Sequence, residues 1–250
     1  MPIESLIVLC LLTVGPSAAV GVPQKPAATP ATVIETTSAG AMTAVVRAIT
    51  EEKWNPILDN RVQQSPAASA LGAAWKPSDP RWQKARAALG ARMTALIESY
   101  TKSTQIPDHI QKSAGSLPPG PDRDAMVAAL TGPVGPALVR QQAGMTFVVQ
   151  SLSDNPNGPA PGTPAWAKQI NDTTKRFDER VGPALPPDDG THRAELQKIF
   201  LSPVREPLGQ VWTFVISNAT RQLDTGLNLM LFDHQAMIER DIAKAVAGRH

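Results

Sequence analysis

The segment ALTGPVGPAL (residues 129–138) decides the predicted fold, because it places a proline between two stretches whose apolar residues have helical spacing. Proline gives no amide hydrogen to the preceding turn and moves the residue before it out of the helical region. One helix therefore ends before Pro133, and the same proline can start the next helix. Residues 199–208 (IFLSPVREPL) repeat this arrangement around Pro203. Both segments predict a tight corner between two helices.

The corner is the last of three short patterns that occur twice in the same order. Pro-x-Trp-x-Lys occurs at residues 80–84 and 164–168, Leu-Pro-Pro at 117–119 and 185–187, and (Gly/Ser)-Pro-Val at 132–134 and 202–204. An ordered recurrence of this kind predicts a duplicated helical unit. We therefore expect an all-α fold of two related helical-repeat units packed together. The expected units are residues 39–152 and 164–250, joined by a Pro/Gly/Asn-rich linker at 153–163.

Composition supports helices and excludes one class of partner. Among 250 residues there are one Tyr, five Phe and five Trp, whereas Ala, the best helix former, is abundant. The 24 prolines stand between periodic segments or at first-turn positions, where helices tolerate them. A formal net charge of +2, without any run of Lys or Arg longer than two residues, argues against nucleic acid as a partner.

The N-terminus has the features of a targeting segment. An apolar run of about ten residues begins at Leu6 and is too short to span a bilayer, which takes roughly twenty. Small residues before Ala19 predict a signal peptide at 1–19, although Glu4 stands where a basic residue is usual. Residues 20–38 are rich in Pro, Ala and Thr and predict a flexible tether. We expect a periplasmic or secreted protein, with an uncleaved membrane anchor as the alternative.

The single cysteine, Cys10, would leave with the signal peptide, so the mature chain would hold no disulfide.

Local signals place the predicted helix boundaries. A helix begins near Ser38 and ends or bends at Pro56, and a loop around 63–77 holds Trp75. The other boundary signals are the N-caps Asp79, Asp122 or Asp124, Thr163 and Thr191, and a break at Gly226 before the last helix.

The second corner also resembles a known family. Glu195, Phe200 and Ser202-Pro203 look like the signature of the exported bacterial family called domain of unknown function 2059, which has a Glu, an aromatic and then Ser-Pro-x-Gly. The first corner keeps the glycine, as Gly135, but lacks the aromatic, and the second has Arg205 where the glycine is expected. The resemblance implies an all-helical exported protein and carries no assigned activity.

The search for reactive or metal-binding groups finds weak candidates. His192 and Glu195 are three residues apart on a predicted helix, yet two ligands do not make a metal site. Asp233 and His234 with Glu239 resemble a proton relay, but no nucleophile motif accompanies them. We predict no catalytic residues, no metal ligands and no cofactor.

Four apolar residues are instead candidates for a partner surface or groove: Trp54 and Trp75, near breaks in the helical pattern, and Leu229 and Phe232, in a segment that is apolar nearly all round. They favour a non-catalytic protein that binds another protein or an envelope component. The alternative is a periplasmic enzyme whose carboxylates form no recognisable motif. A membrane partner is expected only if the signal segment is uncleaved, and the sequence does not define the oligomeric state.

Cleavage after Ala19 gives a mature chain that begins at Val20. Mass spectrometry of the protein isolated from the cells that naturally make it should find this N-terminus. A chain that retains residues 1–19 in the membrane fraction would show an uncleaved anchor instead.

Overall fold

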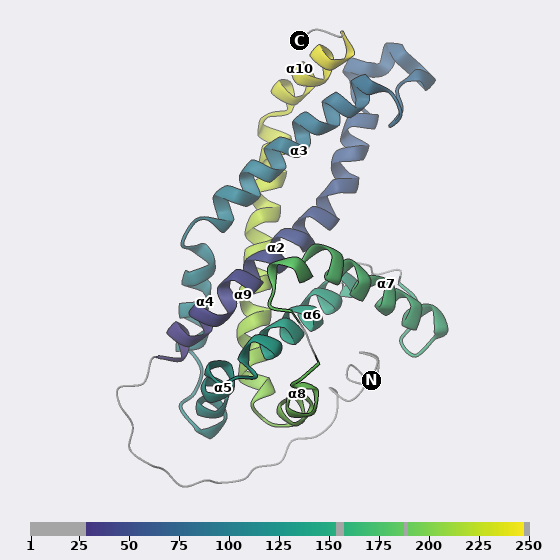
Figure 1. The fold of residues 1–250 in the computed structure, drawn as a ribbon. Helices are drawn as coiled ribbons and strands as arrows, with labels where there is room; N and C mark the ends of the chain where they lie inside the picture. Colours follow the sequence, from purple (N-terminus) through teal and green to yellow (C-terminus); the bar gives the residue numbers. More distant parts are fainter. Residues whose placement is uncertain (1–28, 154–157, 188–189, 248–250) are drawn as a thin grey trace. The chain divides into compact units, whose positions relative to one another are not determined.

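The computed structural model describes residues 29–153, 158–187 and 190–247, and within these ranges it contains helices and no strand (Figure 1). The predicted all-α fold is confirmed. The elements are α2 (Pro30–Gln63), η1 (Pro66–Ala74), α3 (Pro80–Thr101), α4 (Gln105–Gly115), α5 (Pro121–Thr131), α6 (Gly135–Ser153), α7 (Pro164–Arg180), η2 (Gly182–Ala184), α8 (Arg193–Phe200), α9 (Arg205–Asp233) and α10 (Gln235–Val246). The expected signal peptide, the first part of the tether and residues 154–157 of the linker lie outside the described residues.

The helices form two compact units. Unit 1 combines the described part of Met1–Val45 with Ile106–Ser217, and unit 2 combines Val46–Gln105 with the described part of Asn218–His250. α2 and α9 contribute to both units. The first Pro-x-Trp-x-Lys pattern therefore falls in unit 2, whereas the other five recurring segments fall in unit 1. These units follow other boundaries than the expected repeat, and the duplication stays a prediction.

Helix α2 begins earlier than its sequence suggests. The Thr29 hydroxyl accepts a hydrogen bond from the Thr32 amide at 3.3 Å, and Pro30 takes the first helical position. The side chain of Ile34 is fully buried in unit 1. The predicted tether is therefore wrong from Pro30 to Ser38, because burial of this turn stabilises a helix that composition alone disfavours. Pro56 does not end the helix, which continues to Gln63.

In unit 2, α2 and α3 are antiparallel and in one register. Arg47 pairs with Glu98 at 3.4 Å, and Arg86 pairs with Asp59. Twelve residues forward along α2 thus correspond to twelve residues back along α3. Five side chains of α3 recur at helical spacing and are buried: Trp82, Ala85, Leu89, Met93 and Ile97.

Helix α9 packs against α3 in the same unit, again antiparallel. A Cβ added to Gly226 would lie 3.4 Å from Leu96, and the Tyr100 hydroxyl donates to Gln222 at 3.0 Å. Burial raises the pKa of Tyr100 to about 12, so the phenol remains a neutral donor. The predicted break at Gly226 is wrong, since the glycine allows α9 to approach α3 closely while remaining helical.

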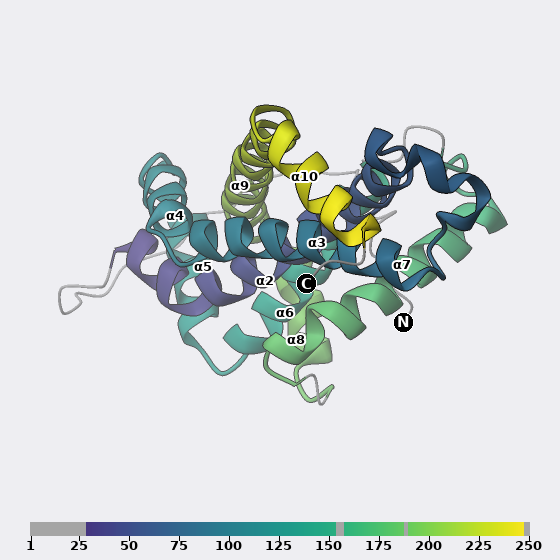
Figure 2. The same ribbon diagram turned by 90° about the horizontal axis from the view of Figure 1, so that it is seen from above.

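The chain breaks instead at His234, and α10 then packs on α3 and η1 (Figures 1 and 2). Ile238, Ile242 and Ala245 form its buried face. Glu239 accepts hydrogen bonds from Arg61 and from Ser65, which is 4% exposed. A twelve-residue helix is marginal alone, so this packing maintains it.

In unit 1, both Pro-containing corners form as predicted. The Gly135 amide donates to the Gly132 carbonyl at 3.0 Å, and the Arg205 amide donates to the Ser202 carbonyl at 3.3 Å. The apolar residues expected to meet across the corners are buried: Leu130 and Leu138 at the first, Phe200 and Leu208 at the second. The α5–α6 and α8–α9 corners therefore share one hydrogen-bonded turn.

Two of the predicted N-caps are confirmed and the others are wrong. Asp79 accepts from the Arg81 amide at 2.7 Å, and Thr163 accepts from the Trp166 amide at 3.2 Å, which confirms both caps. Asp122, Asp124 and Thr191 are not caps. Their helices begin after Gly120, which has no side chain to cap an amide, and after His192, whose imidazole caps none.

The remainder of unit 1 packs α6 against α5 and α7. Phe147 and Phe177 have ring centroids 5.9 Å apart. Arg140 donates to the carbonyl oxygens of Gly182 at 3.2 Å and Pro186 at 3.0 Å, and to Asp178 at 3.3 Å. Because these acceptors follow or end α7, Arg140 holds the end of that helix against α6.

Gly135→Ala should destabilise unit 1, because the new Cβ would overlap the Leu130 carbonyl oxygen and lie 2.9 Å from its carbon. We expect a loss of about 1–3 kcal/mol in the free energy of unfolding, measured by urea denaturation. Gly209→Ala is the matched control, because nothing lies within 4 Å of its added Cβ and Ala favours a helix by up to about 1 kcal/mol. Equal effects of the two variants would contradict this account of the corner.

Candidate interaction surface

Two of the four candidate surface residues lie in the interior. Trp54 is 2% exposed and Trp75 is 3% exposed, so neither indole offers a surface to a partner. The prediction mistook proximity to a helix break for exposure. Trp54 lies inside α2, and Trp75 directly follows η1 as its C-cap.

Both indoles have hydrogen-bond partners in unit 2. Trp75 donates through Nε1 to the Val62 carbonyl at 2.8 Å, and its own carbonyl accepts from Gln63 at 2.8 Å. Trp54 donates through Nε1 to Asp224 Oδ1 at 2.7 Å. The two tryptophans therefore hold elements of unit 2 together.

Asp224 on α9 serves two groups of α2 at once. Its Oδ1 accepts from Trp54, and its Oδ2 pairs with Lys53 Nζ at 2.5 Å. Lys53 compensates the charge of a carboxylate that is 24% exposed. This arrangement satisfies a buried donor and fixes α9 beside α2.

The other two candidates are exposed. Phe232 is 73% exposed and Leu229 is 53% exposed, and they lie three residues apart on α9. Their neighbours Leu227 and Met230 point into unit 2, at 0% and 8% exposure. Leu229 and Phe232 thus belong to the outward side of a helix whose inward side is fully packed.

The outward side also includes polar residues. Arg221 and Thr225 precede Leu229 at intervals of four residues, and Asp233 follows Phe232. All are exposed, and spacings of three and four residues place helical side chains on one side. We call these five residues the α9 surface. Within the described part of the chain, neither the Arg221 guanidinium nor the Asp233 carboxylate forms an ion pair.

None of the carboxylates of the described residues is fully buried. None is among the buried polar residues, which are Ser38, Thr50, Ser65, Ser113, Gln142 and Thr173. Hydrogen bonds from Arg81, Lys102 and Lys168 lower the pKa of Asp79, Glu98 and Asp172, respectively. A general acid at neutral pH requires the opposite shift.

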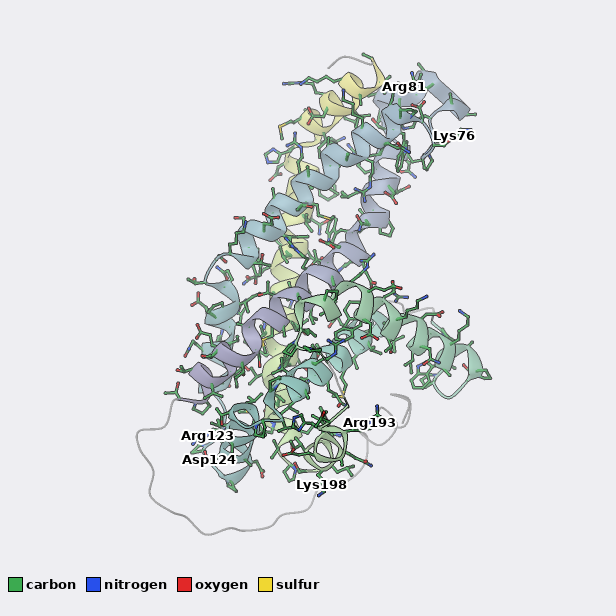
Figure 3. All side chains as sticks on the ribbon, in the orientation of Figure 1. Lys76, Arg81, Arg123, Asp124, Arg193 and Lys198 are labelled. Atoms are coloured by element: carbon green, nitrogen blue, oxygen red, sulfur yellow. The ribbon has the colours of Figure 1, made fainter. Side chains whose placement is uncertain are left out.

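The two weak motif candidates remain without further ligands or partners of the required kind. His192 Nδ1 lies 3.5 Å from Glu195 Oε2, but the described ranges bring no group of three His, Cys, Asp or Glu side chains together. Glu239 is bonded to Arg61 and Ser65. On α8, Arg193 and Lys198, labelled in Figure 3, are exposed.

None of the helices within 29–153, 158–187 and 190–247 is long and apolar enough to cross a bilayer. Comparison with protein-family models, curated proteins and solved structures finds no match. The resemblance to the exported family stays a prediction.

Sequence reasoning did not find the groups that hold unit 2 together. Asp224 is 170 residues from Trp54, and Glu239 is 178 residues from Arg61. No local spacing relates such pairs. The only signal available in the sequence was the presence of charged residues on amphipathic helices. Such residues are equally consistent with exposure to solvent and with ion pairs between helices.

Asp224→Ala should destabilise unit 2, because it leaves the buried Trp54 indole without an acceptor. We expect a loss of about 1–3 kcal/mol in urea denaturation followed by tryptophan fluorescence. Asp224→Asn keeps an acceptor and should lose less. Asp172→Ala, which removes an exposed pair with Lys168 within α7, is the control and should change stability by at most about 0.5 kcal/mol. An equally small effect at both positions would contradict this role of Asp224.

Proposed function

We propose that this chain is an exported, non-catalytic helical protein that binds another protein through the α9 surface. The observation that carries the proposal is the exposure of Phe232 and Leu229, one turn apart on a helix whose inward side is fully packed. Exposed aromatic and aliphatic side chains at adjacent turns are typical anchors of protein interfaces. Export is inferred from the N-terminal sequence.

Three further observations support binding over catalysis. The described carboxylates are exposed or engaged with Arg, Lys and Ser side chains, as Asp224 and Glu239 illustrate. The shifted carboxyl pKa values are lowered, and the surface that remains unoccupied is apolar at its centre. Such a surface binds by excluding water and has no group suited to proton transfer at neutral pH.

Other exposed apolar side chains do not form an equivalent pair. Ile57 is 39% exposed on α2, Val149 is 55% exposed on α6, and Leu201 is 62% exposed at the end of α8. Single exposed apolar residues are normal on protein surfaces. Leu201 therefore provides a control of similar size and exposure in unit 1.

A photo-crosslinking amino acid in place of Phe232 should give discrete protein adducts in the cells that make the protein. The same amino acid in place of Leu201 should give few adducts or none. Leu229→Glu, combined with the crosslinker at 232, should reduce the adducts, because a charge at the centre of the surface costs desolvation.

The absence of adducts at position 232, or equal adducts at 201, would overturn the proposal. Circular dichroism of each variant checks the fold. Since residues 201 and 232 are both exposed, neither substitution should disturb packing.

A further inference from the structure

We infer that the partner that covers the α9 surface is a second copy of this chain, bound antiparallel about a twofold axis. The inference rests on the proposed function, because it takes the α9 surface as a docking site. What it adds is the occupant, which follows from the order of charges and apolar groups along the helix.

The α9 surface carries opposite charges at its two ends. Arg221 begins it and Asp233 ends it, twelve residues later, which is about 18 Å along a helix. Both side chains are exposed, and neither has an ion-pair partner in the described residues. A twofold axis requires each surface to be complementary to itself, and opposite charges at opposite ends meet this requirement.

The same register also determines which side chains face one another between the two charged ends. When Arg221 of one copy is level with Asp233 of the second, Thr225 is level with Leu229, because each lies four residues inward from its end. Phe232 then lies level with Gln222 of the second copy. The neighbouring Arg221 of that copy is close enough for its guanidinium to contact the Phe232 ring. The aromatic face can accept that guanidinium as a cation–π partner, and each large apolar side chain meets a smaller or flexible one.

A parallel arrangement lacks this complementarity. It would place Arg221 level with Arg221 and Asp233 level with Asp233, and like charges at both ends oppose association. The net charge of +2 adds little repulsion between two copies of the whole chain. One side of a single helix buries a small area, so we expect weak association, with a Kd between roughly micromolar and submillimolar.

Charge reversal tests the antiparallel pairing directly. Arg221→Glu and Asp233→Arg, each alone, bring like charges together twice in the dimer and should weaken association about tenfold in sedimentation velocity. The double variant R221E/D233R restores opposite charges and should regain most of the affinity. Arg240→Glu is the control, since it changes charge equally in unit 2 but lies outside the α9 surface, and it should leave association unchanged.

Each outcome separates this inference from the proposed function. If both single variants lose affinity and the double variant recovers it, the result supports a twofold pair of α9 helices. A different partner would not carry the compensating charge changes, so its affinity would not recover in the double variant. A chain that stays monomeric up to about 500 µM, or single reversals without effect, overturns the second copy as occupant. Crosslinking at position 232 to a different protein would then leave the proposed function standing. Dimers unaffected by Phe232→Ser and Leu229→Ser would overturn the second copy as occupant of this surface, and the absence of any crosslinked protein at position 232 would overturn the proposed function as well.

Discussion

The buried indole N–H of Trp54 imposes the constraint on which unit 2 depends. An unpaired donor at 2% exposure would cost about 1–3 kcal/mol, so an acceptor beside it stabilises unit 2. Asp224 supplies the acceptor from α9, and Lys53 compensates the charge this brings. The contact between Asp224 and Trp54 fixes α9 beside α2. Helix α3 then packs antiparallel to both helices, in one register. The pairs Arg47–Glu98 and Tyr100–Gln222 are consistent with that register.

Unit 1 depends on a different constraint, the close approach of backbone at a corner. Gly135 lies where any Cβ would overlap the Leu130 carbonyl, whereas Arg205 occupies the equivalent position of the second corner. Both corners nevertheless have the same amide-to-carbonyl hydrogen bond, from Gly135 to Gly132 and from Arg205 to Ser202. Proline determines that the helix ends, and the residue two positions later determines how tightly the next helix can begin.

These two constraints explain what could be predicted from sequence. Most signals that act within a few residues were interpreted correctly: the Asp79 and Thr163 caps, the prolines behind them and both corners, but not the caps expected at Asp122 or Asp124 and at Thr191. Signals that depend on distant packing were not. Ser38 and Gly226 look like helix boundaries locally, yet burial continues α2 and α9 through them. Among the four candidate residues, only Leu229 and Phe232 are exposed, because exposure depends on packing by residues far along the chain, which covers Trp54 and Trp75.

Folding alone accounts for every large apolar side chain of α9 except two. Leu223 and Leu227 fill the inward side, and Gly226 permits the approach to α3, whereas Leu229 and Phe232 point outward. A polar residue at either position would satisfy the fold at lower risk of aggregation. Exposed aromatic area next to water is unfavourable, and this cost is what the proposed binding through the α9 surface would remove. The opposite charges at its ends favour a partner with the complementary order, and an inverted copy of the same helix, the occupant proposed above, has that order.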